Sequence, residues 1–478
     1  MKKALSFILI FAVIFSLCAC GGSNSDVPQE TKAPEGLQIG YARESIMPEG
    51  QVNISGAANA EHRVSTGFLD ILYATCIAVS ENGNTLLLFS TDTLGAKGVW
   101  TKAVRKLINE ATGVPEENIH IAGTHTHSGP AIGLDNLTLV AQYKPIYMNA
   151  LVKAAKDAIA DQAPATLYGA KVQTEKMNFI RHYLMADGSY AGSNFGDFSK
   201  EIVDYAAKND PEMVLVKAER EGKKDILMMN FQAHPCFGGD TSVYTSLSAD
   251  YIGTTRTAVE AGTDAHFIFF LGATGNHNTG SKIAADQSYI NGDVKLYGEA
   301  LAKYALDALS NMTPIQGAGI KVTQKTLEYK SNDYGQDRLE QALLPYEMYK
   351  QNGDSKSASA YAQSLGFQSV FECNGIVSCS KYPATGTIDL TTCTFGGVGF
   401  VAAPYEMFSA NGMHIKENSP FEYTLISTVT NSGLGYFPTK EAYAYGCYES
   451  YTARFASGVA EDVAAEYVKM LEELGGEK

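Results

Sequence analysis

Thr-His-Thr-His-Ser-Gly-Pro, residues 124–130, combines a strand end with a candidate metal site. It follows the short apolar run 119–122, which is typical of a strand, and its Gly-Pro end predicts a turn. Side chains two residues apart in an extended segment point to the same face, so His125 and His127 can look into one pocket. Such a pair can bind a metal ion, but it can also be two polar residues of a loop.

The segments on either side of this motif predict an α/β fold. Apolar runs at 72–79 and 85–90 are typical of strands, and the Asn-Gly turn between them predicts a hairpin. An amphipathic segment at 100–112 predicts a helix, which precedes the strand at 118–122. Strand, helix and strand in this order form the usual unit of an α/β sheet. Further strands are expected at 37–45, 165–172, 213–218, 225–232, 267–271, 319–326, 398–402 and 423–429, and further helices at 145–161, 249–261, 291–310 and 461–473.

Residues 36–478 are long enough for a large core, and by length they could form one domain or two or three. The polar stretches 192–210 and 351–362 are predicted to be surface insertions, because apolar runs resume after each, and no linker interrupts the rest. We therefore expect one large domain with mixed β-sheets flanked by α-helices. A (β/α)8 barrel is the alternative, since His-x-His after a first strand is usual there, but the predicted hairpins argue against it.

The N-terminus predicts export and a lipid anchor. Two lysines and the apolar run 4–17 form a secretory signal that is too short for a convincing membrane span. The Leu-Cys-Ala-Cys sequence at its end resembles a bacterial lipobox, which predicts a signal peptide at 1–19 and a lipid on Cys20. Residues 20–35 are polar and rich in Gly, Ser and Pro, as expected of a flexible tether. The domain would then be extracytoplasmic and anchored to the bacterial cell membrane; a plain signal peptide with an incidental cysteine is the alternative.

Charge and cysteine content narrow the possible partners. A net charge of −15 without a basic stripe argues against a nucleic-acid partner. Beyond Cys18 and Cys20, six cysteines are sparse for a disulfide scaffold and lack zinc-ribbon spacing. Cys373 and Cys379 could pair, but isolated buried thiols are the preferred interpretation.

Three further ligand-type residues follow predicted strands. His234 precedes a proline, Glu406 would open a helix, and Tyr436 follows a Gly-rich turn. Each has an ordinary explanation alone: a hydrogen-bonded core histidine, a first-turn acid near a helix dipole, and a packed tyrosine. Together with the motif histidines they make a plausible nitrogen and oxygen shell for Zn²⁺, which activates water and polarises carbonyls in hydrolases.

These residues resemble the neutral, non-lysosomal ceramidases and the bacterial proteins that share their N-terminal catalytic domain. The resemblance extends over nearly all of the predicted domain, and residues 124–130 are its strongest motif. It implies zinc ligands at His125, His234, Glu406 and Tyr436, the last within a Tyr-x-x-Thr-x-Glu-x-Tyr segment at 436–443. It also implies that His127, Arg181 and Tyr448 line an amide-binding pocket and hold the developing oxyanion.

One loop departs from the family pattern. Ceramidases carry a Gly-Asp-Val-Ser-Pro-Asn loop with a required serine, whereas residues 275–280 have Asn276 and Asn278 at the aspartate and serine positions. An amide is neither nucleophile nor general base, so His277 is a candidate substitute, unless it is a loop histidine bonded to backbone. The chain also stops where ceramidases continue into an immunoglobulin-like domain.

The resulting hypothesis is a zinc-dependent hydrolase of an N-acyl amide or related bond in a small-molecule or lipid-like substrate. The altered loop argues against ceramide itself. Either His127 or His277 would be the general base. The alternative is a surface lipoprotein that retains the pocket and binds a ligand without catalysis.

Overall fold

The predicted hairpin is present and starts the large sheet. In the computed structural model, which describes residues 36–56, 60–237, 244–283 and 292–475, strand β3 (Tyr73–Glu81) pairs antiparallel with β4 (Asn84–Thr91). Asn82 and Gly83 between them both have positive φ, as a two-residue hairpin turn requires. The predicted signal peptide, the tether and Cys20 lie outside the described residues.

A helical crossover extends this hairpin. Helix α1 (Gly98–Thr112) leads from β4 to β5 (Ile119–Gly123), and these two strands are parallel. The predicted strand, helix and strand are therefore confirmed.

The large sheet is mixed and open. Its order is β14-β12-β11-β6-β1-β3-β4-β5, with β16 beside β6, and only the β12–β14 and β4–β5 pairs are parallel. Because β14 and β5 are separate ends of this order, the sheet does not close, and the barrel alternative is wrong. The remaining strands are β1 (Gln38–Ser45), β6 (Ala163–Gln173), β11 (Glu212–Arg220), β12 (Asp225–Phe231), β14 (Ala265–Leu271) and β16 (Thr313–Pro314).

A second sheet packs against the first. It has the order β17-β18-β19-β21, formed by β17 (Ile320–Lys330), β18 (Thr385–Phe395), β19 (Val398–Ala402) and β21 (Tyr423–Ser427). Side chains of both sheets, among them Ile77, Met228 and Phe400, form one buried apolar cluster between them. This interior is the apolar contact that the alternating strand patterns require.

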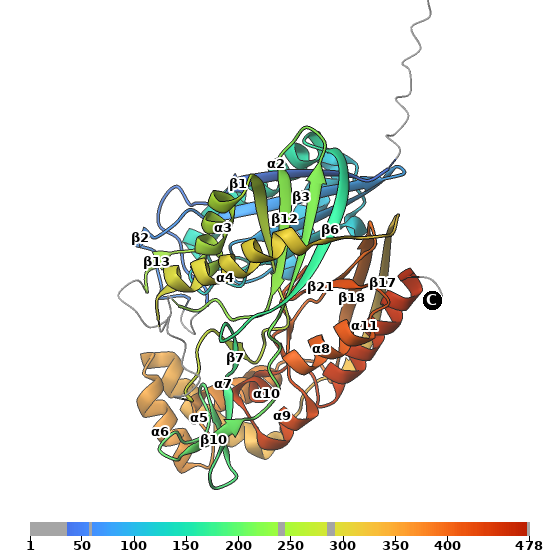
Figure 1. Cartoon of the computed structure of the whole chain (residues 1–478). Helices are drawn as coiled ribbons and strands as arrows, with labels where there is room; N and C mark the ends of the chain where they lie inside the picture. The colour runs from blue at the N-terminus through green and yellow to red at the C-terminus, as the bar shows by residue number, and fades with distance from the viewer. Residues whose placement is uncertain (1–35, 57–59, 238–243, 284–291, 476–478) are drawn as a thin grey trace, which may run out of the picture. The chain divides into compact units, whose positions relative to one another are not determined.

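Helices cover the outer face of each sheet (Figure 1). Helices α1, α2 (Thr138–Ala160), α3 (Asp250–Gly262) and α4 (Val294–Ala308) lie on the large sheet, and α8 (Ser409–Asn418) and α11 (Val459–Gly475) lie on the small one. The layers are thus helix, sheet, sheet and helix, which confirms mixed sheets flanked by helices. Of the helices in the described ranges, none is both long enough and apolar enough to span a bilayer.

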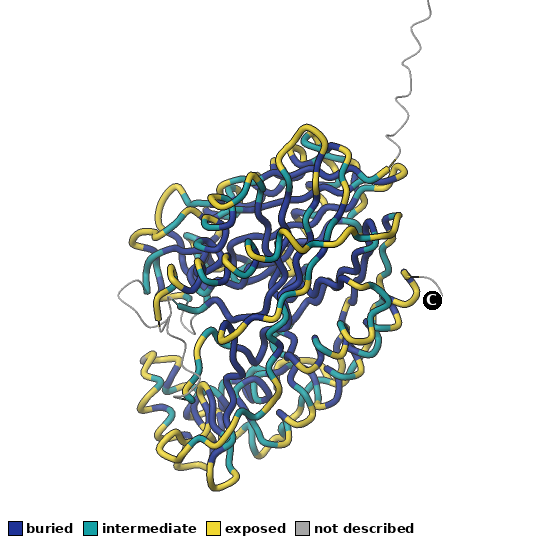
Figure 2. Tube along the Cα trace, viewed as in Figure 1, coloured by how far each residue is buried: buried dark blue, intermediate teal, exposed yellow. Residues whose placement is uncertain are grey.

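A helical region adjoins the C-terminal ends of several strands (Figure 1). It contains α5 (Gln336–Asn352), α6 (Ser355–Ser364), α7 (Val370–Cys379), α9 (Lys440–Tyr445) and α10 (Tyr448–Thr452), with the three-stranded sheet β10-β8-β9 (Ile202–Tyr205, His182–Met185, Tyr190–Gly192). Figure 2 shows the central strands buried and the outer helices α5 and α6 largely exposed. Short pairs complete the fold: β2 (Gly67–Phe68) with β13 (Ser246–Leu247), β7 (Phe179–Ile180) with β15 (His277–Asn278), and β20 (Glu406–Met407) with β22 (Tyr436–Phe437).

One predicted boundary needs correction, and one predicted insertion proves to be helical. Helix α2 begins at Thr138 and not at Pro145, because Val140 and Tyr143 are buried in the core and this packing outweighs the hydrogen bond lost at the proline. The polar stretch 351–362, predicted to be a surface insertion, lies in α5 and α6, and within it Ala358 and Ala362 are buried.

Candidate metal centre

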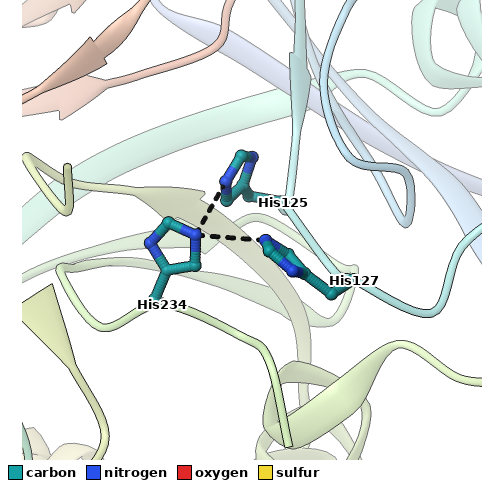
Figure 3. A group of neighbouring side chains, drawn as sticks. All are labelled: His125, His127 and His234. Carbon is teal, nitrogen blue, oxygen red and sulfur yellow. Dashed lines mark hydrogen bonds between the residues drawn. The ribbon is translucent and has the colours of Figure 1, made fainter. Parts of the chain in front are cut away.

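Three imidazoles meet where two strands of the large sheet end. His125 and His127 follow β5, and His234 follows β12. Nε2 of His234 lies 3.1 Å from Nε2 of His125 and 3.1 Å from Nε2 of His127, as Figure 3 shows. The two motif histidines therefore share one site with His234, and the three can hold a metal ion.

The backbone brings them together in an unexpected way. The segment after β5 is not extended: His125 has φ of +68°, and His127 begins a turn. The left-handed conformation costs a non-glycine residue about 1 kcal/mol or more and is found where surrounding structure imposes it. The prediction that both side chains share a pocket is correct, but its reason, the two-residue alternation of a strand, is wrong.

Backbone partners orient the three rings. Nδ1 of His125 lies 2.5 Å from the carbonyl oxygen of Leu94, and Nδ1 of His234 lies 3.4 Å from that of Thr274. A carbonyl only accepts, so each Nδ1 carries a proton, and in a neutral ring this leaves the Nε2 lone pair free for a metal ion. His127 also has a backbone hydrogen bond, to Gly56, and burial, His125 and Arg181 lower its pKa well below 6.5. Burial and the same kinds of neighbour also lower the pKa of His234 well below 6.5. The rings of His127 and His234 are thus neutral, as metal ligands must be.

A carboxylate faces the same point. Oε2 of Glu406 is 3.3 Å from Nε2 of His125, is buried and has no hydrogen-bond partner among the described residues. Glu406 does not open a helix, as the sequence suggested: it lies in β20, because Glu406 and Met407 pair parallel with Tyr436 and Phe437, and α8 starts only at Ser409.

The residues present fit a zinc ion. Lone pairs on the imidazole nitrogens and an anionic oxygen repel one another at these distances unless a proton or a metal ion lies among them. Two ligands of a tetrahedral zinc, each 2.0–2.2 Å from the ion, are about 3.3–3.5 Å apart, close to the separations of 3.1 and 3.3 Å here.

Tyr436 and Arg181, both predicted to belong to the site, lie next to it. Tyr436 is the direct strand partner of Glu406. The Arg181 guanidinium lies 5.5 Å from the centre of the Tyr436 ring. The centres of the Tyr436 and Tyr448 rings are 5.9 Å apart. Burial and the nearby Glu406 carboxylate raise the pKa of Tyr436 well above 10, so without a metal its hydroxyl keeps its proton.

His277 does not join the cluster. It is fully buried, its Nδ1 lies 3.1 Å from the carbonyl oxygen of Ala273, and its Nε2 accepts from the amide of Asp210 at 3.4 Å. Both ring nitrogens are thus occupied by backbone groups, which argues against His277 as the general base.

The altered loop has a structural role. The carbonyl of Asn276 accepts from the amide of Arg181 at 3.0 Å, and its side chain accepts from the amide of Ser409 at 2.8 Å and donates to its hydroxyl at 3.2 Å. Gly275 donates its amide to Met407, and a side chain there would meet the carbonyl oxygens of Glu406 and Met407. The loop therefore fixes both the Arg181 strand and the Glu406 strand.

We expect Asn276→Ala to lower the free energy of unfolding by about 2 kcal/mol, because the buried first amide of α8 loses its acceptor. Asn276→Asp retains that acceptor and should stay within about 1 kcal/mol of the wild type. Urea denaturation monitored by circular dichroism measures both. Equal losses in the two variants would contradict this role.

Two buried histidines away from the metal centre predict acid sensitivity. Burial holds the pKa of His120 and of His277 at about 3, below the unfolded value of 6.5. The unfolded chain therefore binds more protons between pH 6.5 and 3, and stability falls as the pH drops through this window. From pH 7 to 5 we expect a loss of about 2 kcal/mol per histidine. Urea denaturation at both pH values tests this. In His277→Gln the loss of stability between pH 7 and pH 5 should be smaller by the contribution of one histidine.

Sequence reasoning missed several supporting residues. Arg63 is 1% exposed and donates from Nη1 to the carbonyls of His127, at 2.5 Å, and Ser55, at 2.8 Å. Nothing in the sequence distinguishes it from a surface arginine. His182 and Glu449, in contrast, directly follow the predicted Arg181 and Tyr448, and this adjacency was the available signal. With Cys447 they form a second group of metal-ligand types.

Comparison with solved structures supports the fold. A crystal structure of neutral ceramidase from Pseudomonas aeruginosa superimposes with a TM-score of 0.66 and 16% identity over 93% of this chain and 76% of that one. A second structure, described as ceramidase complexed with C2, gives 0.64 and 16% over 92% and 75%. No curated protein matches the sequence.

The sequence itself matches a family profile over residues 38–295, which contain both motif histidines, Arg181, His234 and the loop 275–280. This match covers more than half of the chain. The chain belongs to the neutral/alkaline non-lysosomal ceramidase family.

Proposed function

We propose that the protein is a zinc-dependent hydrolase that cleaves an amide or related bond of an N-acyl, lipid-like small molecule. Membership of a ceramidase family supports hydrolysis as the reaction type. The observation that carries the zinc assignment is the convergence of three imidazole Nε2 atoms with Oε2 of Glu406 at separations of 3.1 to 3.3 Å.

The ligand set proposed from the geometry differs from the sequence expectation in one residue. His125, His234 and Glu406 would hold the ion, and His127 joins them because its Nε2 is as close to His234 as that of His125. Tyr436 lies beside Glu406 at the edge of this set. When bound, zinc supplies Lewis-acid activation of a carbonyl and of water.

The neighbouring donors would complete the chemistry. Arg181 and Tyr448 flank Tyr436, so their N–H and O–H groups can hold a carbonyl oxygen as it gains negative charge. Burial and the charges of neighbouring groups hold the pKa of His234, like that of His127, well below 6.5. The site is therefore preorganised for a cation and an anionic oxygen.

The test is metal content together with turnover. Purified protein should contain one zinc per chain, and a panel of N-acyl amides and esters of different acyl length should include a substrate whose hydrolysis stops on chelation and returns with zinc. Stoichiometric zinc without turnover on any compound would favour the ligand-binding alternative, and absence of zinc would contradict the centre itself.

We further propose that the domain is anchored outside the cell membrane by a lipid on Cys20, on the strength of the Leu-Cys-Ala-Cys sequence at 17–20. Metabolic labelling with radioactive palmitate should mark the wild type and not Cys20→Ser. Equal labelling of both would contradict this anchor.

A further inference from the structure

Two buried side chains hold Arg181 beside the metal centre. Arg181 is 7% exposed, and its Nη2 donates to Oε1 of Glu449, which is fully buried in α10. A free arginine side chain has many rotamers, and fixing one of them costs conformational entropy. The ion pair with the buried Glu449 carboxylate favours one of these rotamers before any ligand binds.

Glu449 is itself held by His182. Its Oε2 accepts from Nε2 of His182 at 2.8 Å, and Nδ1 of His182 lies 2.7 Å from the hydroxyl of Tyr445. The Tyr445 ring stacks on Tyr190, with centroids 4.4 Å apart and planes at 17°. A chain of hydrogen bonds thus runs from a packed aromatic pair to the Arg181 guanidinium.

The order of residues along the chain explains the arrangement. Arg181 and His182 are consecutive, and so are Tyr448 and Glu449. The first member of each pair contacts the ring of Tyr436, and the second members bond to each other. Each segment therefore contributes one group to the site and one group to the support behind it.

The charges of this support are already balanced. Burial alone would raise the pKa of Glu449, but Arg181 and His182 outweigh it and hold the pKa at about 2. The carboxylate is therefore ionised at neutral pH and compensated by the guanidinium.

The alternative use of this cluster is a second metal site with Cys447 as a ligand. The separation of 2.8 Å between Nε2 of His182 and Oε2 of Glu449 is a hydrogen-bond length, shorter than the roughly 3.3 Å between two ligands of one tetrahedral zinc. Burial also raises the pKa of the Cys447 thiol well above 9, so it stays protonated. Hydrogen bonding is the better account.

We propose that Glu449 and His182 are positioning residues that hold the Arg181 guanidinium against Tyr436, ready to bind an anionic oxygen in the metal centre. This inference rests on the proposed function, because it gives Arg181 a ligand. It adds to that function two residues that act through Arg181.

The test is a double-mutant cycle on the zinc-loaded full chain. Glu449→Gln keeps the shape and one acceptor oxygen; we expect unchanged zinc content and a 10- to 100-fold fall in kcat, with a smaller change in KM. Because Glu449 acts through Arg181, Arg181→Lys with Glu449→Gln should be no slower than Arg181→Lys alone. Independent, multiplicative effects would overturn the proposal.

A second readout does not depend on turnover. Acetohydroxamate, a small anionic zinc ligand, should bind the zinc-loaded wild type, and calorimetry should give a Kd about tenfold higher for Glu449→Gln, with the same non-additivity. If no substrate is hydrolysed, the proposed function fails while this cycle still decides the positioning role. Two zinc ions in the wild type and one in Glu449→Gln would show a second metal site and overturn it.

A matched control separates positioning from folding. Arg220 is a buried arginine whose Nη1 lies 2.5 Å from Oδ2 of Asp161, the residue that follows α2. Asp161→Asn removes this carboxylate. We expect it to leave acetohydroxamate binding and kcat unchanged, whatever it costs in stability. A similar loss in this variant would show that the effect of Glu449→Gln is a general consequence of breaking a buried ion pair.

Discussion

His234→Ala should abolish stoichiometric zinc binding and lower kcat/KM by about 1,000-fold or more. Nε2 of His234 is the atom that lies within 3.1 Å of both other imidazole nitrogens, so its removal opens the centre of the ligand set. A bound metal contributes several kcal/mol of transition-state stabilisation, and 4 kcal/mol corresponds to about three orders of magnitude. Metal analysis after dialysis, followed by steady-state kinetics, measures both effects.

The control for this prediction is another buried histidine. His120 is 1% exposed, its Nδ1 lies 3.2 Å from the Asn431 amide nitrogen, and its ring faces Phe400. His120→Gln should therefore lose stability but keep one zinc per chain. If His234→Ala retained stoichiometric zinc, or both variants lost it equally, the three-histidine centre would be wrong.

The polar ends of the strands were predictable from the sequence. Apolar runs of five to seven residues mark β5, β12 and β21, and a proline or glycine follows each one. Because these patterns are local, they also locate His125, His127 and His234 at strand ends. The sequence analysis selected Glu406 correctly as a candidate ligand but placed it at the start of a helix. A two-residue strand such as β20 forms because it pairs with β22 and has no sequence pattern of its own.

What the sequence could not show depends on long-range contacts. Arg181 and Glu449 are 268 positions apart, and no local rule pairs them. The left-handed backbone at His125 follows from contacts with the segment 91–95, where Thr93 accepts its amide and Leu94 accepts its Nδ1. The altered loop looked like a loss of chemistry, but Asn276 supports α8 and the Arg181 strand, a role visible only with the fold.

Arg181→Lys should separate rate from metal binding. We expect it to keep one zinc per chain, because Arg181 does not belong to the ligand set, and to lower kcat/KM by about 100- to 1,000-fold. Removing one preorganised donor to a developing oxyanion costs this much in hydrolases. Zinc content, steady-state kinetics and urea denaturation on the same preparation measure the outcome.

Lysine is the informative replacement because it preserves the charge. Alanine would leave the buried Glu449 carboxylate without its cation and destabilise the fold by about 3–5 kcal/mol, which would obscure the kinetic effect. An ammonium is a point charge without the planar fork of arginine, so it can satisfy Glu449 or reach the pocket but not both. Arg220→Lys, in the ion pair with Asp161, is the matched control and should leave kcat/KM unchanged. An undiminished rate in Arg181→Lys would mean that the charge alone suffices and that the geometry fixed by Glu449 and His182 has no part in the reaction.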